Sequence, residues 1–309
     1  MISDMLTVTV LVGILSSGIR LATPYLYAAI GETFGQRSGV LNLGVDGQML
    51  LGAFSAFYVV YRTGNLGLAV LVALLVGALM GLAMAFVTVN LHAEQGISGI
   101  GFYLFGLGMS DLLFQKLIGT VETVNGFPKV DIPVLSSLPY LGEIFFTHNI
   151  LVYIAYLLVP LSWFVLNRTT LGLKIRSVGE NPEAADSLGV SVARVRYFTV
   201  TLGGTLSGIA GASLSIGLLN VFQQNMTSGL GFIAVALVYF GGWRPWGVLG
   251  GALLFSMVNS LQLWMQVLGI PIPSDIAVML PYILTILVLV ASVSKVRAPS
   301  ALTKPFERD

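Results

Sequence analysis

Long apolar runs constrain this chain more than any other feature of its sequence. Segments of about 20 residues, almost free of charge, recur along its length. Of its 309 residues, 56% are hydrophobic and 9% are charged, whereas a soluble domain carries charge on roughly a quarter of its residues. The mean hydropathy of +0.89 agrees. We therefore expect an integral membrane protein, in which the bilayer is the solvent that decides the fold.

Only helices and closed barrels can span a bilayer, because every backbone polar group must find a partner within the protein. The apolar runs have the length of a helical crossing and lack the short alternation of barrel strands. We predict an all-α polytopic bundle in a single domain, residues 1–309, with about nine crossings (eight to ten). They lie at 5–30, 38–60, 66–90, 96–118, 148–167, 197–219, 229–242, 246–268 and 276–294. The short run 229–242 either crosses or re-enters.

The basic residues predict how the bundle is oriented. If all nine runs cross, one side receives the connections 31–37, 91–95, 168–196 and 243–246 and the tail 295–309, with 11 of the 15 Lys and Arg residues. The positive-inside rule places that side, including the C-terminus, in the cytoplasm. The outer loop 119–147 contains three prolines and several hydrophobic residues, which favours an ordered lid or a short interfacial helix.

Several classes of function are not expected. The net charge is +1 and no polybasic run exists, so we expect no nucleic-acid partner. Cysteine is absent, and His92 and His148 lie far apart with no acid at ligand spacing, so we predict no metal site. No group of residues suggests catalysis, and we predict a chain that is not an enzyme. No G-x-x-x-x-G-K-[ST] loop occurs, so this chain is expected to hold neither ATP nor another cofactor.

Polar residues inside the apolar runs are candidates for function. On a helix Asn42 and Asp46, four residues apart, would share a face, and an acid at such depth costs a few kcal/mol unless it faces protein or water. Asn42, Asp46 and Gln48 either line a polar path, sit at a hinge, or form a structural hydrogen bond. Asp111 and Arg20 pose the same choice, and Arg20 could pair with either acid. Pro24 is expected to kink or interrupt the first segment.

An ion-coupled secondary transporter of a small polar solute remains an alternative. Asp46, Asp111 and Arg20 would then form its ion or proton relay.

Glycines four residues apart recur within the runs, among them Gly77 and Gly81, and Gly204 and Gly208. Small residues at this spacing let helix backbones approach closely in lipid. We expect a tightly packed bundle.

The stretch "GENPEAADSLGV", residues 179–190, carries three acids in an apolar chain. Asn181 suits an N-cap, Pro182 the first helical position, and Glu183 the positive end of the helix dipole. Gly189 stands where a left-handed stop would fall, and Ser191 can cap the next helix. The pattern predicts a short, self-terminating helix followed by a crossing.

The segment "EAADSLG", Glu183 to Gly189, resembles the EAA---G signature of ABC importer permeases. The Ile-x-Leu-Pro expected downstream is replaced by "FTVTLGG", which indicates a divergent branch. Three longer segments, beginning at Arg37, Thr169 and Gly229, resemble the branch that serves simple sugars and nucleosides. The turn "GGWRPWG", residues 241–247, is most similar to the smaller of two paired permeases in bacterial purine-nucleoside importers.

This resemblance implies a permease subunit in the bacterial inner membrane. Its partners would be a cytoplasmic ATPase that binds and hydrolyses ATP, a second permease, paralogous rather than identical, an extracytoplasmic substrate-binding protein and membrane lipid. The helix that couples to the ATPase would comprise Asn181, Pro182, Glu183, Ala184, Ala185, Leu188 and Gly189. For a ribose and a base, the candidate path residues are Asn42, Asp46, Gln48, Phe102, Phe105 and Asp111.

Overall fold

The computed structural model describes residues 8–269 and 297–307, together with Met279, Ile283, Ile286, Leu287 and Val290 between them. The described elements are, in order, α2 (Val8–Arg37), α3 (Val45–Thr63), α4 (Leu66–Ala85), the π-helix η1 (Phe86–Asn90), α5 (Gln95–Leu117), β1 (Lys129–Asp131), α6 (Leu141–Phe145), β2 (Thr147–Asn149), α7 (Ile150–Arg168), α8 (Thr170–Glu180), α9 (Pro182–Ser187), α10 (Val192–Ala212), the π-helix η2 (Ser213–Leu219), α11 (Leu230–Phe240) and α12 (Pro245–Val267).

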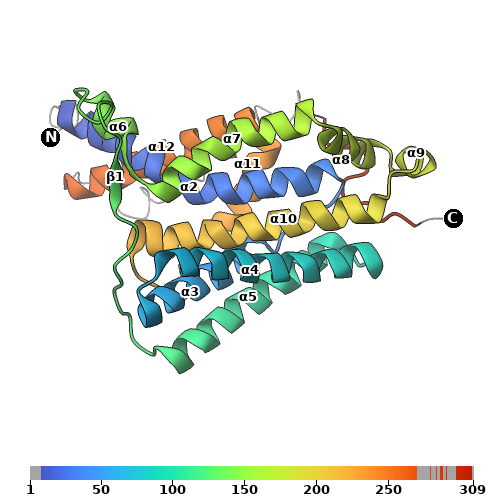
Figure 1. The fold of residues 1–309 in the computed structure, drawn as a ribbon, viewed down its shortest axis with the longest axis horizontal. Coiled ribbons are helices and arrows are strands. Elements are labelled where there is room, and N and C mark those ends of the chain that lie inside the picture. Colours follow the sequence, from blue (N-terminus) through green and yellow to red (C-terminus); the bar gives the residue numbers. More distant parts are fainter. Residues whose placement is uncertain are drawn as a thin grey trace.

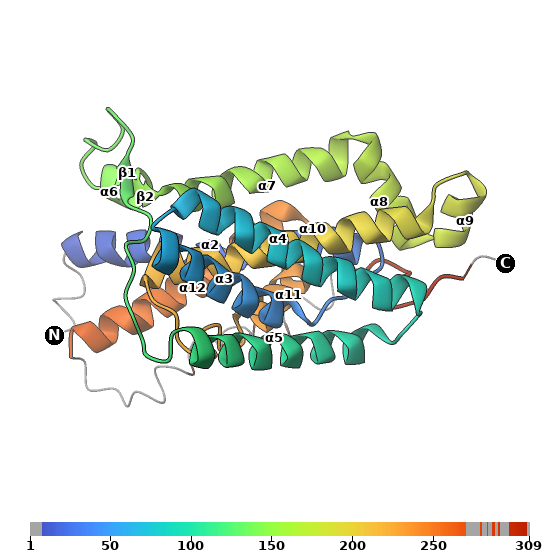
Figure 2. The ribbon, with the colours of Figure 1, turned by 60° about the horizontal axis from the view of Figure 1, so that its bottom comes forward.

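The long helices run side by side along one axis, with α10 between α2 and α4 (Figure 1). Helix α5 lies along one edge of this bundle and α7 along the opposite edge (Figure 2). Helices α8 and α9 lie with the C-terminal tail at one end of the bundle, and α6 lies with the ribbon of β1 and β2 at the other. The predicted helical membrane bundle is confirmed.

Glycines account for the closest helix packing. A Cβ atom at Gly77 or Gly81 of α4 would collide with the backbone of α10, and one at Gly204 or Gly208 of α10 would collide with that of α4. Where no side chain intervenes, two helix backbones come into direct van der Waals contact. The predicted role of these glycines is confirmed.

The predicted count of about nine crossings is not supported. Among the described residues, six helical stretches are long and apolar enough to span a bilayer: 8–37, 66–90, 95–117, 150–168, 192–219 and 245–267. Helix α3 is not among them, because Asp46, Gln48 and Arg62 make it too polar near its two ends. Helix α11 has 11 residues, a rise of about 16 Å, or half of the hydrocarbon core. Most of the predicted run 276–294 and the start of 5–30 lie outside the described residues.

One prediction about the first segment is wrong and another is narrowed. Residues 31–37 are not a connection but the last two turns of α2, and all except Arg37 are buried. Of the two outcomes predicted at Pro24, a kink or an interruption, the interruption does not occur, since α2 is one helix of 30 residues. A proline removes a single backbone donor, and Pro24 is buried where α2 packs against its neighbours α10 and α12.

The loop 119–147 is ordered, as predicted. Strand β1 pairs with β2, so that Val130 lies opposite His148. The amides of Val124 and Phe127 donate to carbonyl oxygens of Asn220 and Ile216, at 2.9 Å each. These bonds hold the loop against the end of η2.

Candidate functional site

The charged stretch forms a short helix with a cap at each end. The Oδ1 of Asn181 accepts a hydrogen bond from the amide of Ala184 at 3.0 Å, and Pro182 is the first helical residue of α9. Gly189 has φ +83°, the left-handed conformation that ends a helix. Ser191 then caps α10 through the amide of Arg194. The local structure matches the sequence prediction at every cap.

Helix α9 buries one residue, leaves Pro182 and Asp186 half-buried and exposes the others. Ala185 is buried and packs into the main core. Glu183, Ala184 and Gly189 are exposed, and Leu188 is 84% exposed at the tip of the bundle. A large apolar side chain in this position is available to a partner protein. Ala185 instead anchors the helix to its own bundle.

A buried arginine holds the C-terminal tail beside this helix. Arg196 of α10 is 2% exposed; its Nε donates to the carbonyl of Ser38 at 3.3 Å and its Nη1 to that of Lys304 at 3.1 Å. Ser38 directly follows α2, whose C-terminal dipole favours a cation. Ala301 and Thr303 of the tail donate backbone hydrogen bonds to the carbonyls of Gly179 and Gly39.

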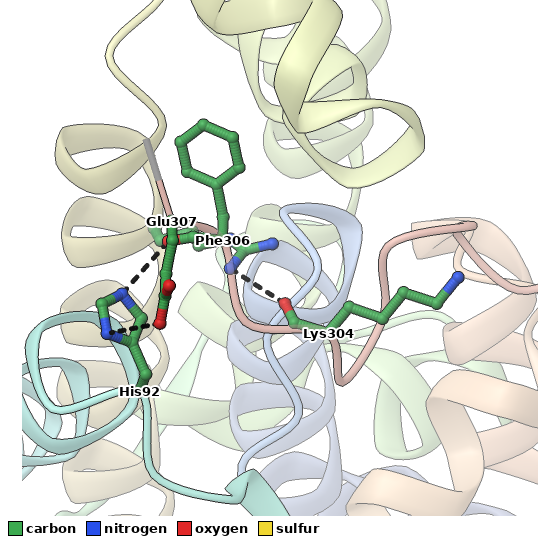
Figure 3. Close-up of polar contacts among 5 residues, drawn as sticks. His92, Lys304, Phe306 and Glu307 are labelled. Atoms are coloured by element: carbon green, nitrogen blue, oxygen red, sulfur yellow. Dashed lines mark hydrogen bonds and ion pairs between the residues drawn. The ribbon is translucent and has the colours of Figure 1, made fainter. Parts of the chain in front are cut away.

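The tail also contacts the connection between η1 and α5. His92 meets the carbonyl of Phe306 at 3.1 Å and the carboxylate of Glu307 at 3.7 Å (Figure 3). A cavity of about 520 Å³ lies here, and its walls include His92, Arg196 and Asp186. The tail, the α2–α3 connection and the α8–α9 segment thus meet at one end of the bundle.

The N-cap of α5 lies at this end too. Glu94 accepts hydrogen bonds from the amides of Ile97 and Gly96, and these bonds lower the pKa of its carboxyl group. This acid therefore stays ionised and stabilises the first turn of α5.

Asp46 fastens two helices together in the interior of the bundle. Its Oδ2 accepts from the hydroxyl of Thr227 at 2.9 Å, and its Oδ1 from the amide of Gly231 at 2.7 Å. Gly231 belongs to the first turn of α11, so the carboxylate lies at the positive end of that half-length helix. Asp46 is fully buried, and its carboxylate is held by protein donors.

Contrary to what the sequence suggested, Asn42 does not share a helix face with Asp46. Helix α3 begins at Val45, so Asn42 belongs to the preceding turn and the helical spacing does not apply. Its side chain accepts from the amide of Gly44 at 2.9 Å and donates to Gln48 Oε1 at 3.2 Å. Asn42, Asp46 and Gln48 are all buried.

Sequence reasoning missed Glu32, a buried acid of α2 that bonds to this turn. It is 2% exposed, and its Oε1 accepts from the amide of Asn42 at 2.9 Å and from Gln36 Nε2 at 3.0 Å. Gln36 Oε1 in turn accepts from the indole of Trp243 at 2.7 Å. The available signal was the spacing of Glu32 and Gln36, four residues apart, but both were assigned to a connection.

The other candidate path residues lie on α5, and of these Phe102 contacts the turn that contains Asn42. Phe102 lies against Gly44, whereas Phe105 is 50% exposed. Asp111 is partly buried; a backbone amide at Asn225 contacts its carboxylate, and its Oδ1 has no hydrogen-bond partner among the described residues. Arg20 is exposed and forms no ion pair with Asp46 or Asp111 in the described part of the chain. The three charges of the alternative relay are not brought together.

No group of three His, Asp or Glu side chains that could hold a metal ion occurs among the residues that the structure describes.

Comparison with known proteins gives a consistent result. A family model described as "Branched-chain amino acid transport system / permease component" matches residues 14–289. The guanosine ABC transporter permease protein NupQ of Bacillus subtilis is 37% identical over 92% of this chain and 93% of its own length. The nucleoside ABC transporter permease protein NupC of Lactococcus lactis is 37% identical over 91% of this chain and 92% of its own.

A permease of Haloferax volcanii, provisionally described as part of a glucose ABC transporter, is 38% identical over 96% of this chain and 98% of its own length. Each of these three organisms has a second ABC transporter permease that is 26% identical to this chain. No solved structure matches.

Proposed function

Because this chain belongs to the family of branched-chain amino acid transport system permease components, we propose that it forms one half of the path through which an ABC importer moves nucleosides. It is a multi-pass membrane protein and a permease subunit of such an importer. Two relatives at 37% identity are named for guanosine or nucleosides, which supports a nucleoside cargo. The relative named for glucose makes a simple sugar the competing cargo.

The observation that carries the proposal is the capped, exposed helix α9. We assign its outer surface, formed by Glu183, Ala184, Leu188 and Gly189, to the ATPase subunit, with Asn181 and Pro182 starting the helix and Ala185 anchoring it. Leu188, at 84% exposure, would lose its contact with water on docking. ATP binding and hydrolysis then belong to that partner. Movement of α9 reaches the bundle through Ala185 and the first turn of α10.

The second permease of this importer is paralogous. Its support is that each organism with a relative at 37–38% identity also has a more distant permease at 26%. A binding protein on the outer side delivers the cargo. The end that carries α9 and the tail lies in the cytoplasm of the cell, since the basic residues collect there.

The path lies along α3 and α5. Phe105 and Asp111 lie on the less buried part of α5, where a base and a ribose could make contact, and Phe102 connects this helix to the α2–α3 turn. Asp46 is buried and holds α3 against the first turn of α11, and Asn42 and Gln48 are buried and bond to each other. Reorientation of α3 and α5 would produce the change between the outward-open and inward-open states.

The coupling role is tested with Leu188→Asp and Glu183→Lys in the reconstituted importer. We expect both variants to insert and fold, because both side chains are exposed, but to lose most cargo-stimulated ATP hydrolysis and uptake. Ser187→Ala, on the same helix at a variable position of the signature, is the matched control and should behave as the unmodified chain. Normal cargo-stimulated ATP hydrolysis and uptake in both charged variants would contradict the proposal that α9 contacts the ATPase subunit.

The cargo is tested by competition. Uptake of labelled guanosine is measured against excess adenosine, ribose and glucose; inhibition by nucleosides alone supports the proposal, and inhibition by glucose alone assigns the chain to sugar transport. Uptake that persists without the ATPase and collapses with the proton gradient would instead support the secondary-transporter alternative.

A further inference from the structure

A second cavity at the basic end has no role in the coupling or the path described above. Its volume is about 460 Å³, and its walls include Arg37, Arg244 and Arg297. These arginines come from the end of α2, the turn before α12 and the tail. Glu180, at the end of α8, is the one acid on the described wall.

The cavity has excess positive charge. Arg176 and Arg244 are both close enough to Arg37 to repel it electrostatically. In the described part of the chain, none of the three lining arginines has a carboxylate within 4.0 Å, the distance that defines an ion pair. Glu180 attracts Arg37 only from a longer distance, and its Oε2 accepts from the hydroxyl of Ser300 at 3.1 Å. An anion in the cavity would offset the repulsion among the arginines.

The turn "GGWRPWG" builds one wall of the cavity. Gly242 and Trp243 both have left-handed backbones, with φ +62° and +55°, and such strain in a tryptophan persists only where the surroundings hold it. The Trp243 indole is bonded to Gln36, and its carbonyl accepts from Arg37 Nε at 2.9 Å. The turn thereby fixes one edge of the Arg37 guanidinium, whose terminal nitrogens make no hydrogen bond to the described residues.

The same turn places a helix N-terminus beside the cavity, since its N-cap residue lines the wall. Arg244 is the N-cap of α12, a helix of 23 residues, and its side chain makes no capping bond. Pro245 has no N–H, and the next amides, of Trp246 and Gly247, precede the first intrahelical donors. The positive end of the helix dipole adds to the three arginine charges.

We propose that this cavity binds a phosphate group, supplied by the headgroup of an anionic phospholipid. Guanidinium groups match phosphate oxygens with paired N–H donors. The lipid source is favoured because α12, one of the spanning helices, starts here, and Trp246 is 51% exposed beside Arg244. Tryptophan and arginine at the end of a spanning helix are typical of the headgroup level. Free phosphate shares this chemistry, and an acidic segment of the ATPase subunit is the competing occupant.

The test compares the full-length chain with Arg244→Gln/Arg297→Gln, in which two exposed side chains lose charge and the anchored Arg37 is kept. Each protein is purified in nanodiscs of phosphatidylcholine with about 10% phosphatidylglycerol, so that retention of the minor, anionic lipid shows selectivity for its headgroup. Native mass spectrometry counts the retained lipids. Lys174→Gln, at an exposed residue of α8 that does not line the cavity, controls for the loss of a positive charge outside the cavity; Arg244→Lys/Arg297→Lys tests recovery by charge alone.

We expect selective retention of phosphatidylglycerol by the unmodified chain and by Lys174→Gln, a loss of about tenfold or more in the glutamine variant, and partial recovery with lysine. A rise in melting temperature with inorganic phosphate, absent in the glutamine variant and without lipid retention, would keep the phosphate site and assign it to a soluble anion. Equal retention and equal melting in all variants would overturn the proposal. So would a glutamine variant that loses only its affinity for the ATPase subunit, because the cavity would then be a protein interface.

Discussion

At the scale of single residues, the buried acids join segments that are distant in sequence. Asp46 bonds to Thr227 and Gly231, about 180 positions further along the chain. Glu32 accepts a hydrogen bond from the amide of Asn42, in the turn that precedes α3. An acid in an apolar segment is costly unless its oxygens meet donors. Both acids meet donors here, so they determine how α2, α3 and α11 fit together.

Removing the Asp46 carboxylate should weaken this junction. In Asp46→Ala the hydroxyl of Thr227 and the amide of Gly231 stay buried without an acceptor, which should cost about 2–4 kcal/mol. Asp46→Asn retains one acceptor and should lose about half as much. Thermal unfolding in detergent measures both. Asp111→Asn, an acid-to-amide change on α5, is the control; an Asp46→Ala protein as stable as this control would contradict the role of Asp46.

His148 predicts a pH dependence at the opposite end of the bundle. Burial, with smaller contributions from Arg20 and Lys129, lowers its pKa below the ordinary value of 6.5, while the carbonyl of Ile144, 2.8 Å from Nε2, partly opposes the shift. The unfolded chain therefore binds this proton more readily than the folded chain. The contribution of neutral His148 to the free energy of unfolding is fully present above pH 6.5, the pKa in the unfolded chain. It decreases as the pH falls from there toward the lower pKa of the folded chain.

We expect the melting temperature to fall between about pH 7 and pH 5, and the fall to be smaller in His148→Gln, which does not titrate. Equal slopes for the two proteins over this range would contradict the assignment.

At the scale of elements, α9 is specified locally and the tail is not. Every cap of α9 lies within ten residues of its centre, and each was readable from residue type. The tail residues 297–307 have no regular structure, and their position depends on Arg196, Gly39, Gly179 and His92. The position of the tail therefore depends on the α2–α3 connection and on the loop that carries α9.

Arg196→Gln should release the tail while the helices stay folded. It removes the charged hydrogen bonds to Ser38 and Lys304, and we expect the local opening free energy of the tail to fall by about 1–3 kcal/mol. Hydrogen exchange at the amides of Ala301 and Thr303 measures this change. Arg194→Gln, an exposed residue on the same helix, should leave exchange unaltered. Unaltered exchange in Arg196→Gln as well would show that the backbone bonds alone hold the tail.

At the scale of the whole molecule, α10 is the helix around which the others assemble. It contacts α2, α3 and α4, and its glycines admit the backbones of α3 and α4 without an intervening side chain. Because lipid offers no hydrophobic drive between helices, this close packing is a principal source of stability.

A leucine in this interface should prevent assembly. Gly204→Leu would place a side chain where the backbone of α4 lies, and we expect little correctly folded protein, since overpacking costs about 1–3 kcal/mol or more. Gly250→Leu on α12 is the matched control, because a Cβ atom there meets open space. The yield of monodisperse protein after detergent extraction measures the difference; similar yields would contradict the packing role of Gly204.

The sequence by itself determined what depends on composition and on neighbouring residues. Its apolar runs required a helical membrane bundle, and its caps defined α9, with Asn181 at the start and Gly189 at the stop. These features rest on solvation and on hydrogen bonds within a few positions, so they can be read directly from the chain.

Only the tertiary structure decided what depends on contacts between distant segments. The half-length of α11, the continuity of α2 beyond residue 30 and the partners of Asp46 follow from packing across the bundle. Glu32 was missed for the same reason. The free energy of a buried polar group depends on whether a donor from elsewhere reaches it, and that donor exists only once the chain has folded.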